Sequence, residues 1–243
     1  MSEFIARSDA CGVYEEPNYA ETYDSYFLTS EINKDHYKFE ADLISSILNG
    51  GRVKSWGDIA CGTGKHLREI QGPNEVQRFG IDRSQSMLNV ARQRGGYDVA
   101  FAERDILDPS LPDFSFDLVT HLWYGYVHQP TLSDVLHFIQ KSVNLTAPNG
   151  QFLLGVCDPL DVFETLEHEN KLVYGGLFKI DAVTWSYTEP WSGHTYENCI
   201  APHTMKIINL VAAQFEQCEI VTYPALDVEG HWNRKALLCR GKK

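Results

Sequence analysis

The chain alternates between short apolar runs and segments whose apolar residues recur every three or four positions. The first kind predicts buried strands and the second predicts helices packed on one face. Because the two kinds take turns along the chain, they predict an α/β fold with a mostly parallel sheet. The strand-like runs cover residues 53–59, 77–82, 99–106, 116–121 and 151–156, and the helical segments cover 39–47, 65–70, 84–91 and 132–143.

The pattern breaks before and after this core. Residues 1–30 are polar and aromatic with poor helical periodicity, so they are either a tail held by its aromatic side chains or a lid over a binding site. Residues 148–150, Pro-Asn-Gly, predict a turn before the fifth strand. Residues 158–203 hold short alternating runs broken by glycine and proline, which predicts an antiparallel insertion that caps the domain.

The end of the chain returns to regular elements. Apolar residues predict a helix over 205–215 and two closing strands over 218–223 and 235–239. With 243 residues, the whole of 1–243 fits one large domain. The aromatic side chains of the cap either line a substrate pocket or hold the cap together; they are Trp185, Tyr187, Trp191 and Tyr196, with His194 among them.

Composition narrows the classes of partner. The net charge is −12 and no cluster of lysine and arginine stands out, which argues against a nucleic-acid partner. No apolar run reaches membrane-spanning length, and the N-terminus lacks a signal-peptide pattern. The six cysteines form no CxxC pair, so we expect neither a metal site nor a disulfide framework. Without such a framework, we expect the protein in the reducing cytoplasm.

A glycine-rich loop follows the first strand-like run, in the sequence Asp58-Ile-Ala-Cys-Gly-Thr-Gly64. A Walker A loop would need serine or threonine at His66, and a dinucleotide-binding loop would need a third glycine at Leu67. The remaining pattern resembles the first motif of class I S-adenosylmethionine (SAM)-dependent methyltransferases. An acid before the loop suits the ammonium group of SAM better than it suits a phosphate.

The resemblance implies a Rossmann-like seven-stranded sheet, SAM as cofactor and S-adenosylhomocysteine (SAH) as product. In that family the loop approaches the methionine part of the cofactor, and tyrosines of the preceding segment close over its carboxylate. The positions of this chain that match are Asp58, Ala60, Cys61, Gly62, Gly64 and His66 for the loop, and Tyr14 and Tyr23 for the tyrosines.

Two further acids follow the second and third strands. Asp82 lies about 20 residues beyond the glycine loop, the spacing at which a carboxylate binds ribose hydroxyls; Arg83 follows it, and Met87 is a candidate to pack on adenine. By resemblance, Asp105 accepts a hydrogen bond from the adenine amino group and Ile106 flanks the ring, with Asp108 as a competing acid.

The fourth strand is followed by an aromatic loop, residues 122–129. Chemistry in open α/β sheets lies at the carboxyl ends of strands, so this loop should face the transferred methyl group. It lacks the motif of base-modifying methyltransferases and the carboxylates of metal-dependent catechol enzymes. It resembles the small-molecule N-methyltransferases that act on amino sugars or glycine. This implies His128 as a catalytic residue and Leu122 as a cofactor contact, with His121 as the spare histidine. Tyr124 and Tyr126 of the same aromatic loop are the other catalytic candidates, and no metal is expected because no cluster has ligand spacing.

The predicted reaction is methyl transfer to a small molecule, most simply to an amine nitrogen, which needs only a free lone pair. A hydroxyl acceptor would need a general base. Two other classes stay open: a dehydrogenase, which the missing third glycine disfavours, and a SAM-binding protein without catalytic activity.

Overall fold

A computed structural model describes residues 12–27, 31–110, 114–158, 182–188, 192–224 and 234–243. Much of the predicted cap, including Trp191, lies outside these residues, as do the side chain of Tyr187 and the first eleven residues.

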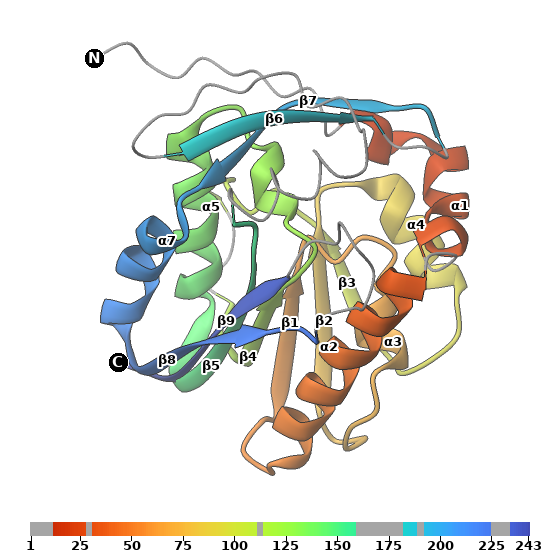
Figure 1. The fold of residues 1–243 in the computed structure, drawn as a ribbon. Helices are drawn as coiled ribbons and strands as arrows, with labels where there is room; N and C mark the ends of the chain where they lie inside the picture. The colour runs from red at the N-terminus through yellow and green to blue at the C-terminus, as the bar shows by residue number, and fades with distance from the viewer. Residues whose placement is uncertain (1–11, 28–30, 111–113, 159–181, 189–191, 225–233) are drawn as a thin grey trace.

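The centre of the fold is a seven-stranded sheet with the order β3-β2-β1-β4-β5-β9-β8 (Figure 1). The first five strands pair in parallel, whereas β9 is antiparallel to both β5 and β8. The strands are β1 (Ser55–Ile59), β2 (Gln77–Asp82), β3 (Ala100–Glu103), β4 (Phe116–His121), β5 (Thr146–Val156), β8 (Phe215–Thr222) and β9 (Lys235–Lys242).

Successive residues of the central strands point to opposite faces of the sheet and pack into two separate hydrophobic cores. Leu118 packs with apolar residues of α2 (Glu31–Asn49) and α3 (Lys65–Glu69), whereas the adjacent Val119 packs with residues of α4 (Gln85–Gln93), α5 (Leu132–Asn144) and α7 (Thr204–Val211). Both residues are fully buried. The fold is therefore three-layered, and the predicted Rossmann-like α/β architecture is confirmed.

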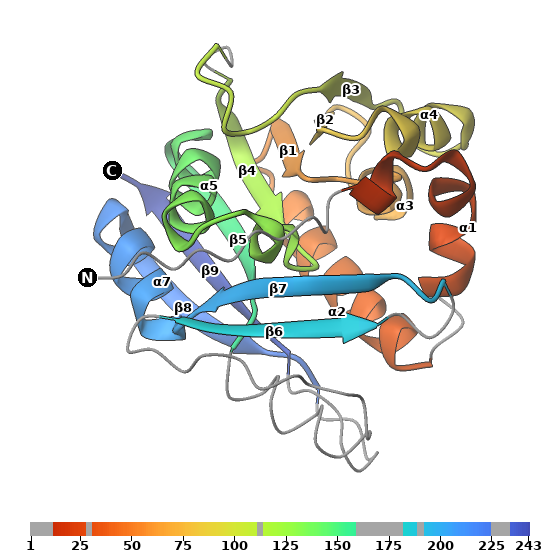
Figure 2. The ribbon, with the colours of Figure 1, turned by 90° about the horizontal axis from the view of Figure 1, so that it is seen from above.

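A separate two-stranded antiparallel hairpin comprises β6 (Ala182–Thr188) and β7 (Thr195–Pro202). It runs above the sheet from the side of α7 to α1 (Pro17–Phe27), as Figures 1 and 2 show from two directions. The predicted antiparallel insertion after the fifth strand is present in this form.

Two local predictions were wrong, and one segment has helices that its pattern did not indicate. Residues 12–27 contain a 3₁₀ turn (Gly12–Glu15) and α1, although their apolar residues lack a clear helical period. The Pro148–Gly150 segment lies inside β5 and not in a turn before it, at the place where the pairing with β4 changes register between Phe116 and Leu118. The helix predicted over 205–215 ends at Val211, and Phe215 already begins β8.

The cysteine prediction also needs correction. Cys218 and Cys239 face each other across the β8–β9 ladder and form a disulfide with a Cα–Cα distance of 4.1 Å. Spacing could not reveal this pair, because it depends on the register of two antiparallel strands.

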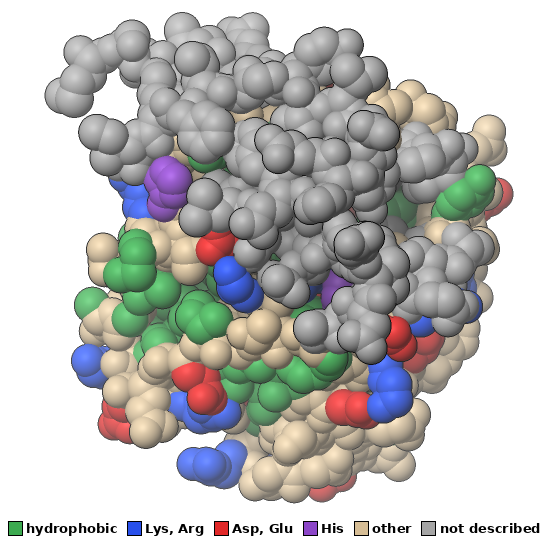
Figure 3. Space-filling view, in the orientation of Figure 1, with side chains coloured by type: hydrophobic (Ala, Val, Ile, Leu, Met, Phe, Trp, Pro, Cys, Tyr) green, Lys and Arg blue, Asp and Glu red, His purple; other side chains and the backbone are tan. Residues whose placement is uncertain are grey.

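The charged side chains and the helices can be described without reference to a partner. On the face in Figure 3, lysine and arginine are interspersed with acidic side chains and form no continuous basic patch among the described residues. Within the described part of the chain, no helix has the length and apolar character needed to cross a membrane.

Candidate active site

A cavity of about 150 Å³ lies at the carboxyl ends of the parallel strands. The segments that follow β1, β2, β3 and β4 all contribute to its wall, together with the N-terminal segment. This is the position at which open α/β sheets bind ligands. The predicted site residues that line it are Tyr14, Tyr23, Asp58, Ala60, Cys61, Gly62, His66, Asp82, Arg83, Met87, Asp105, Ile106, Leu122 and His128.

The glycine loop reaches the cavity through a left-handed backbone. Ala60, Gly62 and Gly64 have φ values of 54°, 54° and 68°. A Cβ built on Gly62 would meet no atom within 4 Å, so the backbone there borders open space. Gly64 does not line the cavity; a Cβ on it would come within 2.7 Å of the Phe101 ring, so its glycine is needed for packing.

Asp82 supports the same loop from the end of β2. Its Oδ2 accepts a hydrogen bond from the Gly62 N–H at 2.7 Å, and its Oδ1 accepts one from the Ser84 N–H at 2.8 Å. Burial raises the pKa of Asp82, and the two backbone hydrogen bonds oppose the rise. Each carboxylate oxygen can accept more than one hydrogen bond, so Asp82 retains capacity for a ligand hydroxyl.

Asp58 is a second buried carboxylate in the cavity wall. Its Oδ1 accepts from the Thr120 hydroxyl at 2.5 Å, and Thr120 in turn accepts from the Trp56 indole N–H at 2.9 Å. Burial raises the pKa of Asp58 to about 6. A ligand cation would restore the carboxylate to its charged form, so Asp58 suits an ammonium group.

The structure separates the two acids that compete after β3. Asp105 lines the cavity beside Ile106, and its Oδ1 accepts from the Leu107 N–H at 2.8 Å. Asp108 is not part of the cavity wall and accepts from the Ser110 N–H instead. Asp105 is therefore the acid placed to contact a ligand.

His66 lines the cavity from the first turn of α3. Its Nε2 lies 2.8 Å from Oε2 of Glu40, a buried carboxylate on α2. Burial alone would lower the pKa of His66, but the Glu40 hydrogen bond and the charges of Glu40 and Asp58 raise it above its ordinary value. Glu40 also accepts from the Trp123 indole N–H at 3.0 Å and the Tyr223 hydroxyl at 2.7 Å.

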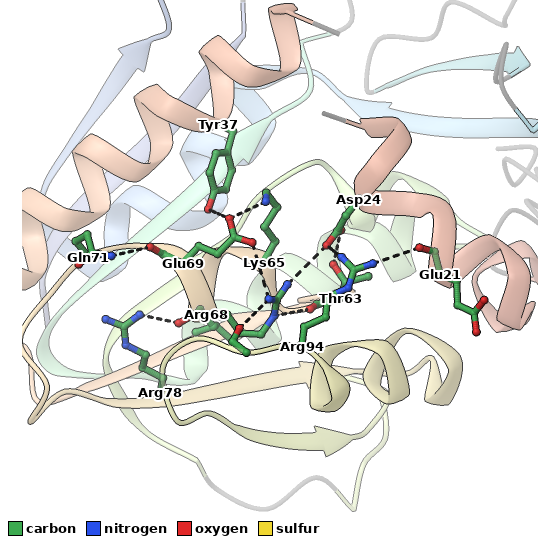
Figure 4. A network of polar contacts seen from close by, with 12 residues as sticks. Glu21, Asp24, Tyr37, Thr63, Lys65, Arg68, Glu69, Gln71, Arg78 and Arg94 are labelled. Carbon is green, nitrogen blue, oxygen red and sulfur yellow. Dashed lines mark hydrogen bonds and ion pairs between the residues drawn. The ribbon is translucent and has the colours of Figure 1, made fainter. Parts of the chain in front are cut away.

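Helix α1 is attached to the cavity wall through Asp24. The Asp24 carboxylate accepts from the Thr63 hydroxyl at 2.5 Å, forms a very short contact with Arg94 and lies 3.6 Å from the Arg68 guanidinium (Figure 4). Asp24 is 7% exposed and Arg68 is 5% exposed. Because Asp24, Tyr14 and Tyr23 all line the cavity, the N-terminal segment forms part of its wall.

His128 lies at the end of the loop that follows β4. Its ring centroid is 6.1 Å from that of Tyr14 and 5.1 Å from that of Tyr196 on β7, and its Nδ1 is 3.6 Å from the Cys199 sulfur. Burial, with a smaller effect from His194, lowers the pKa of His128 to about 4. The imidazole is therefore neutral at neutral pH.

The other predicted catalytic side chains do not line the cavity. Tyr126 is fully buried, and its hydroxyl accepts from the Cys157 N–H at 2.8 Å. Tyr124 packs beside Gly155 and contributes a left-handed backbone with φ 61°. His121 is committed to the backbone: Nδ1 donates to the Ile59 carbonyl at 2.7 Å and Nε2 accepts from the Tyr126 N–H at 3.3 Å. Burial lowers its pKa to about 4.

Sequence reasoning missed several residues of the wall. Thr63 and Lys65 lie within the glycine motif and could have been found from that position alone. Asp24 and Gln129 directly follow the predicted residues Tyr23 and His128 and could have been found in the same way. Tyr37 carries no local signal, because it comes from α2, which meets the cavity only in the folded chain. Among the described residues, no group of three or more histidine, cysteine, aspartate or glutamate side chains is arranged to hold a metal ion.

Comparisons with known proteins agree with this geometry. Residues 57–150 match the family model described as methyltransferase domain. The fold is similar to a SAM-dependent methyltransferase from Clostridium acetobutylicum (TM-score 0.59, 18% identity, 85% of this chain and 92% of that chain). It is also similar to N-methyltransferase NodS from Bradyrhizobium japonicum (TM-score 0.57, 16% identity, 87% and 98%). A third similar structure is CalS10 of Micromonospora echinaspora, an amino pentose methyltransferase (TM-score 0.53, 16% identity, 88% and 98%). No curated protein matches the sequence.

The matched domain contains the glycine loop, Asp82 and the whole of β4, and the fold surrounding it is that of class I methyltransferases. Residues 57–150 therefore form a methyltransferase domain, within a fold that is similar to SAM-dependent methyltransferases. Together with the glycine motif, this supports SAM as cofactor and SAH as product.

Proposed function

We propose that the protein transfers a methyl group from SAM to the amine nitrogen of a small molecule. SAM supplies a methyl group already activated by its sulfonium, so the protein has mainly to bind and align the reactants, which can account for about 7–11 kcal/mol of the barrier. The similarity to NodS, an N-methyltransferase, supports a nitrogen acceptor, and the similarity to CalS10, an amino pentose methyltransferase, supports a small molecule. The cytoplasmic location, the lid role of residues 1–30 and the cap role of residues 158–203 stay predictions.

The cavity residues fit SAM by their chemistry. Open space at Gly62 admits a ligand against the backbone, Asp82 offers acceptors for the ribose diol, and Asp58 suits the ammonium group. Asp105, Ile106 and Met87 would hold the adenine, while Arg83, Leu122, Tyr14 and Tyr23 complete the enclosure. The glycine loop has Leu67 where a dinucleotide-binding loop needs its third glycine, which disfavours a dinucleotide.

The protonation state of His128 is the observation that favours an amine over a hydroxyl as the methyl acceptor. A neutral imidazole with a pKa of about 4 is a weak base, so it would deprotonate a hydroxyl poorly. It can hydrogen-bond to an amine whose lone pair is already available. The adjacent Tyr14 and Tyr196 rings would exclude water and stabilise the cationic product over their faces. His128 would thus orient the nitrogen, with Tyr126 and Tyr124 supporting the loop that carries it.

The test is His128→Asn, assayed against a panel of amines and alcohols. With an amine acceptor, turnover should fall by about 2–10-fold, the effect of one lost hydrogen bond, while SAH affinity stays unchanged. The pH dependence of kcat/KM should follow deprotonation of the acceptor in both proteins. A loss of about 10²–10⁴-fold with an alcohol acceptor would instead assign a general base and O-methylation. Full activity of the variant at every pH would remove His128 from the reaction.

A further inference from the structure

Glu40 is a buried carboxylate outside every sequence motif, and the cofactor cavity is bordered by two of its partners. Its Oε2 lies 2.8 Å from His66 Nε2 and 3.0 Å from the Trp123 indole nitrogen, and both of these residues line the cavity. Its Oε1 accepts from the Tyr223 hydroxyl at 2.7 Å. Glu40 is 2% exposed. Buried carboxylates are costly unless they are fully hydrogen-bonded, so this arrangement calls for a role.

The charge on His66 decides which part of a zwitterionic ligand its ring can bind. A neutral ring that donates from Nε2 to Glu40 would present Nδ1 as an acceptor, which suits an ammonium group. A charged ring has a second N–H on Nδ1, which suits a carboxylate. Asp58, in the same wall, already offers an acceptor for an ammonium group.

The charged groups packed against His66 favour the imidazolium. Glu40 on α2 and Asp58 on β1 raise its pKa, whereas burial and Lys65 on α3 lower it, with a net rise. The ring of Tyr37 on α2 is tilted against that of His66, with 5.1 Å between the ring centroids. Burial raises the pKa of the Tyr37 phenol, so it stays neutral. Lys65, the other nearby cation, is paired with Glu69 at 2.6 Å.

From these contacts we infer that Glu40 is a positioning residue, which keeps His66 charged and oriented so that the ring binds the carboxylate of the cofactor. The inference rests on the proposed SAM site and adds to it the recognition of the amino-acid end. Trp123, held by the same carboxylate oxygen, fixes the neighbouring wall.

The test compares Glu40→Gln with wild type in binding two ligands by titration calorimetry. SAH carries the amino-acid carboxylate, and 5′-methylthioadenosine has the same nucleoside and sulfur without it. At pH 7.5 we expect Glu40→Gln to bind SAH about tenfold more weakly, the effect of losing a charge-assisted hydrogen bond. Affinity for 5′-methylthioadenosine should not change.

A second readout follows His66 itself. In wild type, the NMR signal of His66 should titrate above pH 6.5, because its pKa is raised. In Glu40→Gln the midpoint should fall below 6.5, because burial then acts without the Glu40 charge. SAH affinity should decline with rising pH through the same midpoint in each protein. Asp42→Asn is the matched control: it removes one acid from the same helix, at an exposed site paired with Lys38.

The outcomes separate this inference from the proposed function. If wild type binds neither ligand, the SAM site is wrong. If Glu40→Gln weakens both ligands equally, or leaves the His66 titration unchanged, the positioning role is wrong and the site stands. Should Glu40→Gln fail to fold, His66→Gln gives the same comparison: it must weaken SAH binding selectively and abolish the pH dependence.

Discussion

At the scale of single residues, some side chains that hold the cavity loops in place also line the cavity. Asp82 holds Gly62 and Ser84 through their N–H groups and still faces the cavity. His121 fills a comparable position after β4, but both of its ring nitrogens are used by the backbone. Position at a strand end therefore does not by itself distinguish a ligand contact from a structural residue.

The dual role of Asp82 gives a prediction about affinity. Asp82→Ala should weaken SAM and SAH to a similar degree, by about 1.5–3 kcal/mol, because both ligands carry the ribose diol and the charged acceptor is lost. Titration calorimetry at pH 7.5 measures this, with circular dichroism to verify the fold.

Asp82→Asn is the informative companion variant. Its amide replaces one carboxylate oxygen with an NH₂ group, which cannot accept from the Gly62 or the Ser84 N–H, and it removes the negative charge. An intermediate loss of affinity would fit the ribose role. Unchanged SAH affinity in the folded Asp82→Ala protein would exclude it.

At the scale of elements, a helix or strand could be predicted where neighbouring residues alone determine it. The five parallel strands and the α5 helix follow from apolar runs and periodicity, and they appear within a few residues of the predicted bounds. Helix α1 could not be foreseen in this way. Its position is fixed by contacts of Asp24 with Arg94, 70 residues further along the chain, and of Tyr19 with Tyr196.

The site residues also divide into those with a local sequence signal and those without one. Asp58, Gly62, Asp82 and Asp105 were predicted because each stands at a fixed place in a strand-loop unit, and each lines the cavity. Glu40 was missed, because a glutamate within an amphipathic helix resembles an exposed residue until its three partners are assembled around it.

The attachment of α1 leads to a prediction about that element alone. Asp24→Asn removes the carboxylate paired with Arg94 and one of two carboxylates near Arg68, which keeps Glu69 at 3.8 Å. Breaking a buried pair can cost up to about 3–5 kcal/mol. Because Arg94 is partly exposed, we expect a smaller loss, confined to the docking of α1. Hydrogen exchange of residues 17–27 should accelerate while exchange in β1 and β4 stays unchanged.

A ligand adds a second measurement to the same variant. Since Tyr14, Tyr23 and Asp24 line the cavity, SAH should slow exchange in α1 of the wild type and do so less in Asp24→Asn. Glu21→Gln is the control, because the Glu21 side chain is exposed and only its carbonyl accepts from Arg94. Equal exchange in all three proteins would show that Asp24 does not hold the helix.

At the scale of the whole molecule, the two ends of the sheet have different tasks. The β3-β2-β1-β4 side carries the loops of the cavity, and the β5-β9-β8 side closes the fold with antiparallel pairing. The Cys218–Cys239 bond lies in this second part, and neither cysteine lines the cavity. Stability and ligand binding should therefore respond separately to a reductant.

This separation can be measured. The bond joins residues 21 apart, and closing a loop of this size contributes about 3 kcal/mol in the chain-entropy description. For a chain of this length, 1 kcal/mol shifts Tm by roughly 2–4 °C, so dithiothreitol should lower Tm by roughly 6–12 °C. SAH affinity should stay the same. In Cys218→Ser, Tm should already be low and should not respond to the reductant. Two results would show that the bond does not form in solution: thiol titration of the oxidised protein that finds both cysteines free, or a Tm that does not depend on dithiothreitol. Free cysteines would agree with the reducing compartment that the cysteine spacing predicts.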